Sequence, residues 1–209
     1  MTVRPALFSA SMVMAILQDR KKQTRRARVP WQAGDLLYVR ETLSREGDQA
    51  VFAADRTPCG KEWIWKRDVV PTIHMPRSFS RITLRVTDVR GERLQDITEA
   101  DAYDEGVVLE SADPPFWYVP YVDPMVATAV GIEEKRERPA AACYGKLWNV
   151  INGPGAWEAN PMVAVVTFET IKANVSTVAT ARDLGVGRGK RRPIAPIPSD
   201  DGVHPGLAL

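Results

Sequence analysis

Hydrophobic and polar residues alternate most regularly between residues 80 and 89, where Ile82, Leu84 and Val86 are separated by polar side chains. A period of two residues is typical of a strand with one buried face and one face in water. Four shorter segments rich in Leu, Val, Tyr or Trp also have the composition of strands. They are residues 36–42, 49–54, 61–66 and 162–168. The chain is therefore predicted to be rich in β-structure.

Three short segments carry the signals of helices. Apolar residues recur at helical spacing within residues 12–17. Thr98 and Asp101 match a capping box, and Gly106 is a typical stop for the helix that follows. Residues 141–152 have an amphipathic pattern that ends at a glycine. Many strands with few helices, and no repeated strand-helix-strand unit, indicate the α+β class.

The same pattern separates a folded domain from two segments of different composition. Residues 109–139 are rich in proline and aromatic residues and then in charge, which indicates an inserted loop or flap. Residues 173–209 combine Ala, Thr, Gly, Pro and Arg without sustained apolar periodicity. The chain of 209 residues is therefore predicted to be one domain, residues 1–172, followed by a flexible basic tail.

Composition and charge narrow the function classes. A hydrophobic content of 44% and a charged content of 26% are typical of a folded globular protein. A net charge of +2, from 28 basic and 26 acidic residues, excludes a protein that coats nucleic acid by bulk charge. Cys59 and Cys143 lack the paired spacing of zinc ligands, so we predict no metal site, no other cofactor and no disulfide.

The apolar stretch near the amino terminus is unlike a membrane or secretion signal. Residues 6–17 are too few to span a bilayer, which needs about 20 apolar residues. The basic run, residues 20–28, follows this stretch, whereas a secretory signal carries its positive charge in front. We therefore expect a cytoplasmic protein without a membrane partner.

Four segments occur together in an order that is typical of one family. They are residues 16–26, 34–42, 74–84 and 94–106. In this order they resemble the ASCH domain, a β-barrel of the PUA-like superfamily. Phage and prophage members of the family also share Leu147-Trp148 and residues 151–161. The resemblance covers residues 4–171 and implies a PUA-like barrel with a few short helices.

The resemblance also implies an activity. A small bacterial member of the family removes the acetyl group from N4-acetylcytidine. It uses a lysine, a threonine three residues later and a glutamate in the helix after the long strand. The matching positions are Lys21, Thr24 and Glu105. The chain is therefore expected to be a cofactor-free amidohydrolase acting on N4-acetylcytidine and related N4-acylated cytosine nucleosides.

Two schemes for this hydrolysis are open. In the first, Thr24 attacks the acetyl carbon, neutral Lys21 takes its proton, and Glu105 holds the lysine or protonates the departing nitrogen. In the second, water is the nucleophile and Lys21 donates a hydrogen bond to the oxyanion. The first scheme needs a lysine pKa well below its usual value of about 10.4. Burial and the cations of the basic run would lower the pKa in this direction.

Six further residues are candidates for holding the substrate. They are Arg26, Glu41, His74, Arg77, Tyr118 and Trp148. Glu41 either forms an ion pair with Arg40 on the barrel floor or contacts the cytosine. His74 either satisfies a buried hydrogen bond or binds substrate. Tyr118 would belong to a lid in the inserted segment, and Trp148 offers an aromatic face on which a base can stack.

Two other classes of function fit the same residues. The basic run and the tail could contact phosphates in an RNA-binding or RNA-cleaving ASCH module. A phage interaction or morphogenesis protein without chemistry would use the same fold as a binding surface. RNA binding through several phosphates should weaken steeply as salt rises, whereas hydrolysis of a neutral nucleoside should change little. The response to salt therefore separates the enzyme from the RNA-binding module.

Overall fold

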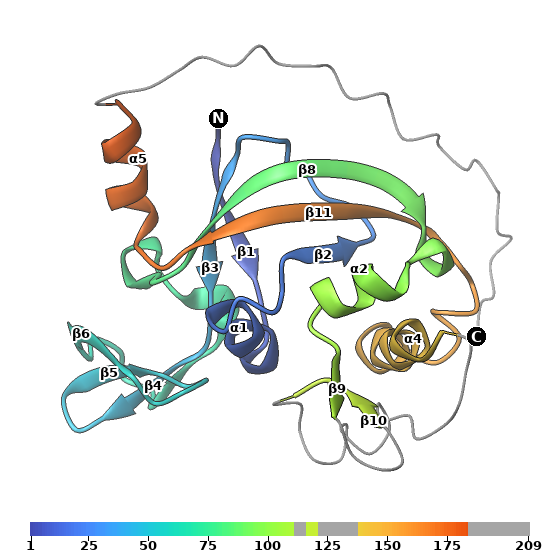
Figure 1. Ribbon diagram of the computed structural model, residues 1–209. Coiled ribbons are helices and arrows are strands. Elements are labelled where there is room, and N and C mark those ends of the chain that lie inside the picture. The colour runs from blue at the N-terminus through green and yellow to red at the C-terminus, as the bar shows by residue number, and fades with distance from the viewer. Residues whose placement is uncertain (111–115, 121–137, 184–209) are drawn as a thin grey trace, which may run out of the picture.

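A five-stranded sheet runs through the centre of the structure, a computed structural model that describes residues 1–110, 116–120 and 138–183 (Figure 1). The strand order is β1-β3-β8-β11-β2, with β1 parallel to β3 and the other neighbours antiparallel. The strands are β1 (Val3–Leu7), β2 (Gln23–Arg26), β3 (Leu36–Arg40), β8 (Thr83–Arg93) and β11 (Met162–Ile171). Together with the helices described below, this sheet confirms the α+β class.

The two longest strands, β8 and β11, pair with each other and arch over the rest of the molecule (Figure 1). The predicted alternation in β8 is confirmed at Leu84 and Val86, which are buried, and at Thr87, which is exposed, but Thr83 on the polar face is also buried. The other edge of β11 holds β2, with Thr24 opposite Val166. The pairing of β2 with β11 therefore places the basic run against the centre of the fold.

A second, four-stranded sheet lies apart from the first, at the lower left of Figure 1. Its order is β6-β5-β4-β7. The strands are β4 (Leu43–Glu46), β5 (Gln49–Phe52), β6 (Pro58–Glu62) and β7 (Val69–Val70). The strand predicted at residues 61–66 is wrong in its bounds, since β6 ends at Glu62. Trp63 and Trp65 follow β6, and their rings meet edge to face with 4.9 Å between centroids.

Helices and short 3-10 turns connect the strands. They are α1 (Ala10–Leu17), η1 (Thr72–His74), η2 (Arg77–Phe79), η3 (Leu94–Asp96), α2 (Glu99–Asp104), α4 (Pro139–Asn152) and α5 (Val175–Asp183). The predicted capping box is confirmed. The Thr98 hydroxyl accepts from the Asp101 amide at 3.0 Å, and the Asp101 carboxylate accepts from the Thr98 amide at 3.2 Å. These two bonds fix where α2 begins.

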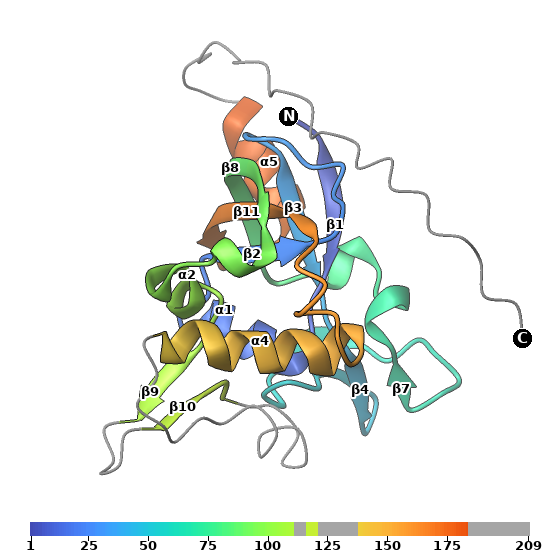
Figure 2. The same cartoon turned by 90° about the vertical axis from the view of Figure 1, so that its right-hand side faces the viewer.

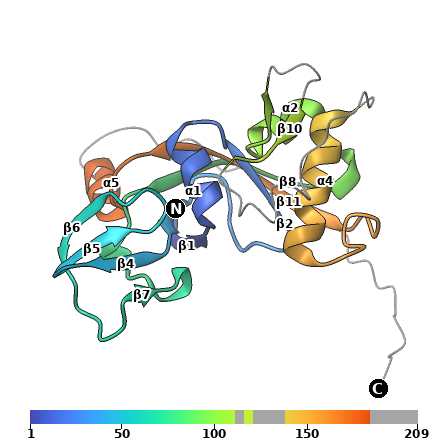
Figure 3. The same ribbon diagram turned by 90° about the horizontal axis from the view of Figure 1, so that it is seen from below.

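Two apolar clusters lie beneath the central sheet, one under each half. Val13 and Ile16 of α1 pack in a cluster with Leu84 of β8. Leu147 of α4 packs with Val165 of β11 in a cluster that also includes α2. In Figure 2, α4 crosses in front of α1, and in Figure 3 β2 lies between the two helices. The space around β2 is therefore bounded by a helix on each side.

Gly145 lies within α4 and packs against Trp157, in the loop that precedes β11. A Cβ at Gly145 would lie 2.8 Å from two ring atoms of Trp157, closer than packed carbons approach. We expect Gly145→Ala to lower the free energy of unfolding by about 1–2 kcal/mol, because overpacking outweighs the better helix propensity of alanine. Urea denaturation measures this change. In a Trp157→Phe background the smaller ring should reduce the cost, and an equal cost in both backgrounds contradicts the explanation.

The predicted closed barrel is not confirmed. Within residues 1–110, 116–120 and 138–183, the central sheet has β1 and β2 at its two edges, and these strands do not pair. The four-stranded sheet forms its own ladder of hydrogen bonds. The structure is therefore an α+β arrangement of separate sheets.

The predicted flap and tail are described only in part. Residues 108–110 and 116–118 form a two-stranded ladder, β9 (Val108–Glu110) with β10 (Phe116–Tyr118), and most of the predicted flap lies outside the described residues. The tail does not begin at residue 173, because α5 is helical there. Val175 and Val178 are buried with Leu36 of β3, and this contact stabilises a helix whose sequence has weak periodicity. Residues 184–209 lie outside the described residues.

Candidate active site

A cavity of about 400 Å³ opens between the amino-terminal segment, β2 and α4. Leu7, Phe8 and Met12 line one side. Leu147, Trp148 and other residues of α4 line the opposite side. The floor comes from the basic run, with Lys21, Thr24, Arg25 and Arg26, and from Glu105, the residue that follows α2. The cavity therefore has apolar walls and a charged floor.

Lys21 and Glu105 form a buried ion pair at this floor. Lys21 Nζ donates to Glu105 Oε2 at 2.6 Å and to the Glu105 carbonyl at 3.0 Å. The two side chains are 3% and 2% exposed. The next residue, Gly106, has a φ of +106°, a backbone conformation in which a residue with a side chain would be strained. This turn fixes the end of α2 against the residues that follow α1.

Burial lowers the pKa of Lys21 below its ordinary value. The charge and hydrogen bond of Glu105 act in the opposite direction, and the cations Arg26 and Arg25 assist the lowering. The net direction is the one that the predicted base requires. Lys21 can therefore reach its neutral form more readily than a lysine in water.

Thr24 lies on β2 and is 6% exposed, with its side chain on the same cavity as Lys21 and Glu105. The predicted constellation is thus brought together by the fold. Among the described residues, the Thr24 hydroxyl has no direct hydrogen bond to Lys21. Proton transfer between them therefore requires a bound substrate, a rotation of the hydroxyl or an intervening water.

Arg25 is a site residue that the sequence interpretation missed. Its side chain is fully buried and forms ion pairs with three carboxylates, those of Glu92, Asp101 and Glu105. The bond to Glu105 Oε1 is 3.3 Å long. An arginine in a run of basic residues is usually solvated, so the sequence has no local signal for this role. Its burial follows from the position of β2 beneath α2 and beside β11.

The carboxylates around Arg25 are held by further donors. Burial alone would raise the pKa of Asp101. Hydrogen bonds from Thr98 and Gln23 and the charge of Arg25 instead lower that pKa to about 2. Tyr144 of α4 also lines this cavity, and its ring centroid lies 6.0 Å from the Arg25 guanidinium carbon. Burial raises the pKa of Tyr144, so its hydroxyl stays protonated.

Arg26 and Trp148, two of the six predicted binding residues, line the cavity. Arg26 lies near two aromatic rings, with centroids 5.2 Å away for Phe8 and 5.8 Å away for Trp31. Its Nη2 donates to the Leu7 carbonyl at 2.6 Å. Trp148 is 7% exposed and packs in the core beneath α4. Both residues are therefore held in fixed positions at the cavity.

The other four predicted binding residues do not line the cavity. They are Glu41, His74, Arg77 and Tyr118. Glu41 follows the end of β3 and is 1% exposed. It accepts from Nε and Nη2 of Arg81, at 2.9 and 2.8 Å, so Glu41 does form an ion pair. The predicted partner, Arg40, is wrong, because its Nη1 donates to the Ile73 carbonyl.

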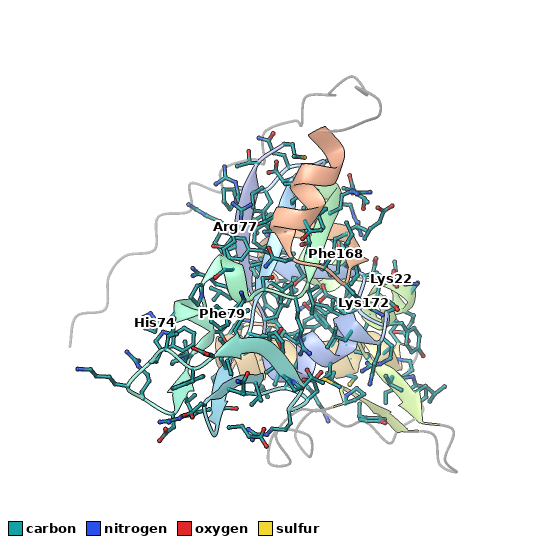
Figure 4. All side chains as sticks on the ribbon, turned by 90° about the vertical axis from the view of Figure 1, so that its left-hand side faces the viewer. Lys22, His74, Arg77, Phe79, Phe168 and Lys172 are labelled. Carbon is teal, nitrogen blue, oxygen red and sulfur yellow. The ribbon has the colours of Figure 1, made fainter. Side chains whose placement is uncertain are left out.

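His74 and Arg77 lie in η1 and η2, beside the four-stranded sheet (Figure 4). Both side chains are exposed, which contradicts the expected buried hydrogen bond for His74. Tyr118 lies in β10, and the remainder of the lid proposed around it falls outside the described residues. Motif order therefore located the charged floor of the cavity but not its full set of walls.

Within the described ranges, no group of three His, Cys, Asp or Glu residues is placed to hold a metal ion. The helices of that part of the chain are also too short or too polar to cross a membrane. Comparison with protein-family models, with curated proteins and with solved structures found no match.

Proposed function

We propose that this chain is a cofactor-free amidohydrolase that removes the acyl group from N4-acetylcytidine and related N4-acylated cytosine nucleosides in the cytoplasm. The observation that carries the proposal is the buried pair of Lys21 and Glu105, which lines one cavity together with Thr24. Burying a lysine and a carboxylate costs free energy, so such a pair at a cavity is a candidate functional site. The proposal includes the ASCH family and its PUA-like fold, which rest on the sequence motifs.

The favoured chemistry uses Thr24 as the nucleophile. Its Oγ1 attacks the carbonyl carbon while Lys21 Nζ takes the hydroxyl proton. Lys21 then gives this proton to N4 of the cytosine as the C–N bond breaks. Water hydrolyses the resulting ester with Lys21 again as the base, which releases the carboxylic acid and restores Thr24.

Glu105 is best suited to orienting Lys21. Its carboxylate accepts hydrogen bonds from Lys21 at Oε2 and from Arg25 at Oε1. Each of its two oxygens is therefore bonded to a cationic side chain. Of the two roles considered for Glu105, holding the lysine therefore fits its contacts.

The apolar walls suit a planar base. Phe8 and Trp148 both line the cavity, and aromatic faces of this kind stack nucleobases. The basic run offers less to an RNA backbone than its sequence suggests. Lys21 and Arg25 are buried in ion pairs, so neither is available to phosphates at the surface. These contacts favour the hydrolase over the RNA-binding module.

The decisive experiment is incubation of the protein with N4-acetylcytidine, with cytidine release followed by chromatography. Thr24→Val keeps the shape of the side chain but removes the hydroxyl, and we expect it to lower kcat/KM by about a hundredfold or more. Thr24→Ser should retain most of the activity. Thr177→Val, at an exposed position on α5, is the matched control and should behave as the wild type.

Two results would change the proposal. Full activity in Thr24→Val, with Lys21 still essential, would assign the attack to water. No cytidine release by the wild type at high enzyme concentration rejects the amidohydrolase, and a structured RNA at low salt is then the next ligand to test.

A further inference from the structure

The charges that line the cavity do not balance. Lys21, Arg25, Arg26 and Arg28 are cationic, and Glu105 is the anionic group among the lining residues that the structure describes. Lys21 and Arg25 already form ion pairs with carboxylates of the protein. Arg26 and Arg28 form no ion pair with any described residue. Positive charge without a protein partner therefore remains on one side of the cavity.

Neither of these two arginines is fully satisfied by the protein. Arg26 donates from Nη2 to the Leu7 carbonyl, but its Nε is buried and has no hydrogen-bond partner among the described residues. Arg28 is exposed at the rim, with no hydrogen bond to another described side chain. Guanidinium groups bind phosphate oxygens through paired N–H donors. The two residues are therefore suited to an anionic group on a ligand.

The two arginines follow Thr24 closely along the chain. Thr24 and Arg26 are alternate residues of β2, and the chain bends at Ala27 before Arg28. Thr24, Arg26 and Arg28 all line the cavity whose opposite side includes Trp148. A base held against Trp148, with its acyl amide at Thr24, would therefore share the cavity with both guanidinium groups.

We infer that the preferred substrate is the phosphorylated form, an N4-acylated cytidine 5′-monophosphate, whose phosphate is bound by Arg28 and Arg26. This inference rests on the proposed function and deepens it. The phosphate takes no part in the reaction and supplies binding free energy alone. A cavity of about 400 Å³ lies at the small end of ligand sites, which favours one nucleotide over a longer strand.

The test compares kcat/KM for N4-acetylcytidine and for its 5′-monophosphate at one ionic strength. We expect the wild type to favour the monophosphate by about tenfold or more, the effect of one charge-assisted contact. Arg28→Gln should lower this ratio by about fivefold or more. Arg67→Gln removes the same charge from an exposed residue that does not line the cavity, and it should leave the ratio unchanged.

A binding measurement separates this inference from the proposed function. Calorimetry should give tighter binding of cytidine 5′-monophosphate than of cytidine, with the difference reduced in Arg28→Gln, whether or not hydrolysis occurs. Equal binding of the two, or a ratio unaffected by Arg28→Gln, overturns the phosphate site while the hydrolase stands. Faster hydrolysis of an internal N4-acetylcytidine in a single-stranded RNA than of the mononucleotide also overturns it, in favour of a polymer.

Discussion

Replacing Lys21 with methionine should abolish most of the hydrolysis, with kcat/KM for N4-acetylcytidine lowered by about a hundredfold to ten-thousandfold. Methionine has nearly the length of lysine but cannot accept or donate a proton at the cavity floor. Glu105 would keep its ion pair with Arg25, so its charge is not left unpaired. Rates of cytidine release measure the loss, and thermal unfolding checks that the variant is folded.

The pH profile gives this prediction a second readout. Because the pKa of Lys21 is lowered, the neutral base accumulates below the pH at which an ordinary lysine loses its proton. In the wild type, kcat/KM should therefore rise with pH and level off below about 10.4. Lys66→Met, at an exposed position outside the cavity, is the control and should keep both the rate and the profile. A Lys21→Met enzyme with the wild-type profile would exclude lysine as the base.

Arg25→Met should destabilise the protein by about 3–5 kcal/mol, the usual cost of removing one partner from a buried ion pair. Arg25 lies among Glu92, Asp101 and Glu105, and Glu105 is itself 2% exposed. Without the guanidinium, these carboxylates repel one another in a poorly solvated space. Urea denaturation of the wild type and the variant at neutral pH measures the change.

A surface arginine supplies the matched control for this prediction. Arg45 also pairs with carboxylates, those of Asp48 and Asp68, but its side chain is 43% exposed. Exposed pairs contribute about 0–1 kcal/mol, so Arg45→Met should change the free energy of unfolding by no more than this. If Arg25→Met were as mild as Arg45→Met, water must reach the Arg25 cluster and the buried network would have little role in stability.

Local patterns predicted part of the fold, because elements such as β8 and α2 leave a local trace, whereas β1 and β2 were not predicted. The alternation of β8 indicates a sheet with one buried face. The capping box, formed by Thr98 and Asp101, fixes where α2 begins. The motif order identified Lys21, Thr24 and Glu105 as one group, and these three residues line the same cavity. Their chemical roles stay predictions until the rates are measured.

Contacts between distant elements left no such trace. Arg25 and Glu41 are both buried charges whose ion-pair partners lie in other elements. Neither the residue spacing nor the composition around Arg25 and Glu41 identifies those partners. The helix α5 also depends on a contact with a distant element, because Val175 and Val178 pack against Leu36 of β3 and this packing stabilises the helix. The expected barrel required pairing between strands, which local alternation does not specify.

The pairing of β2 with β11 delays formation of the candidate site until β11 has been synthesised. Residues 23–26 have no ladder partner until residues 164–167 have left the ribosome. Until then the cationic segment stays in the nascent chain without the strand that holds it. Contacts between such distant segments also slow folding. A chain interrupted before β11 would therefore carry Lys21, Thr24 and Glu105 without the strand that supports β2 at the cavity.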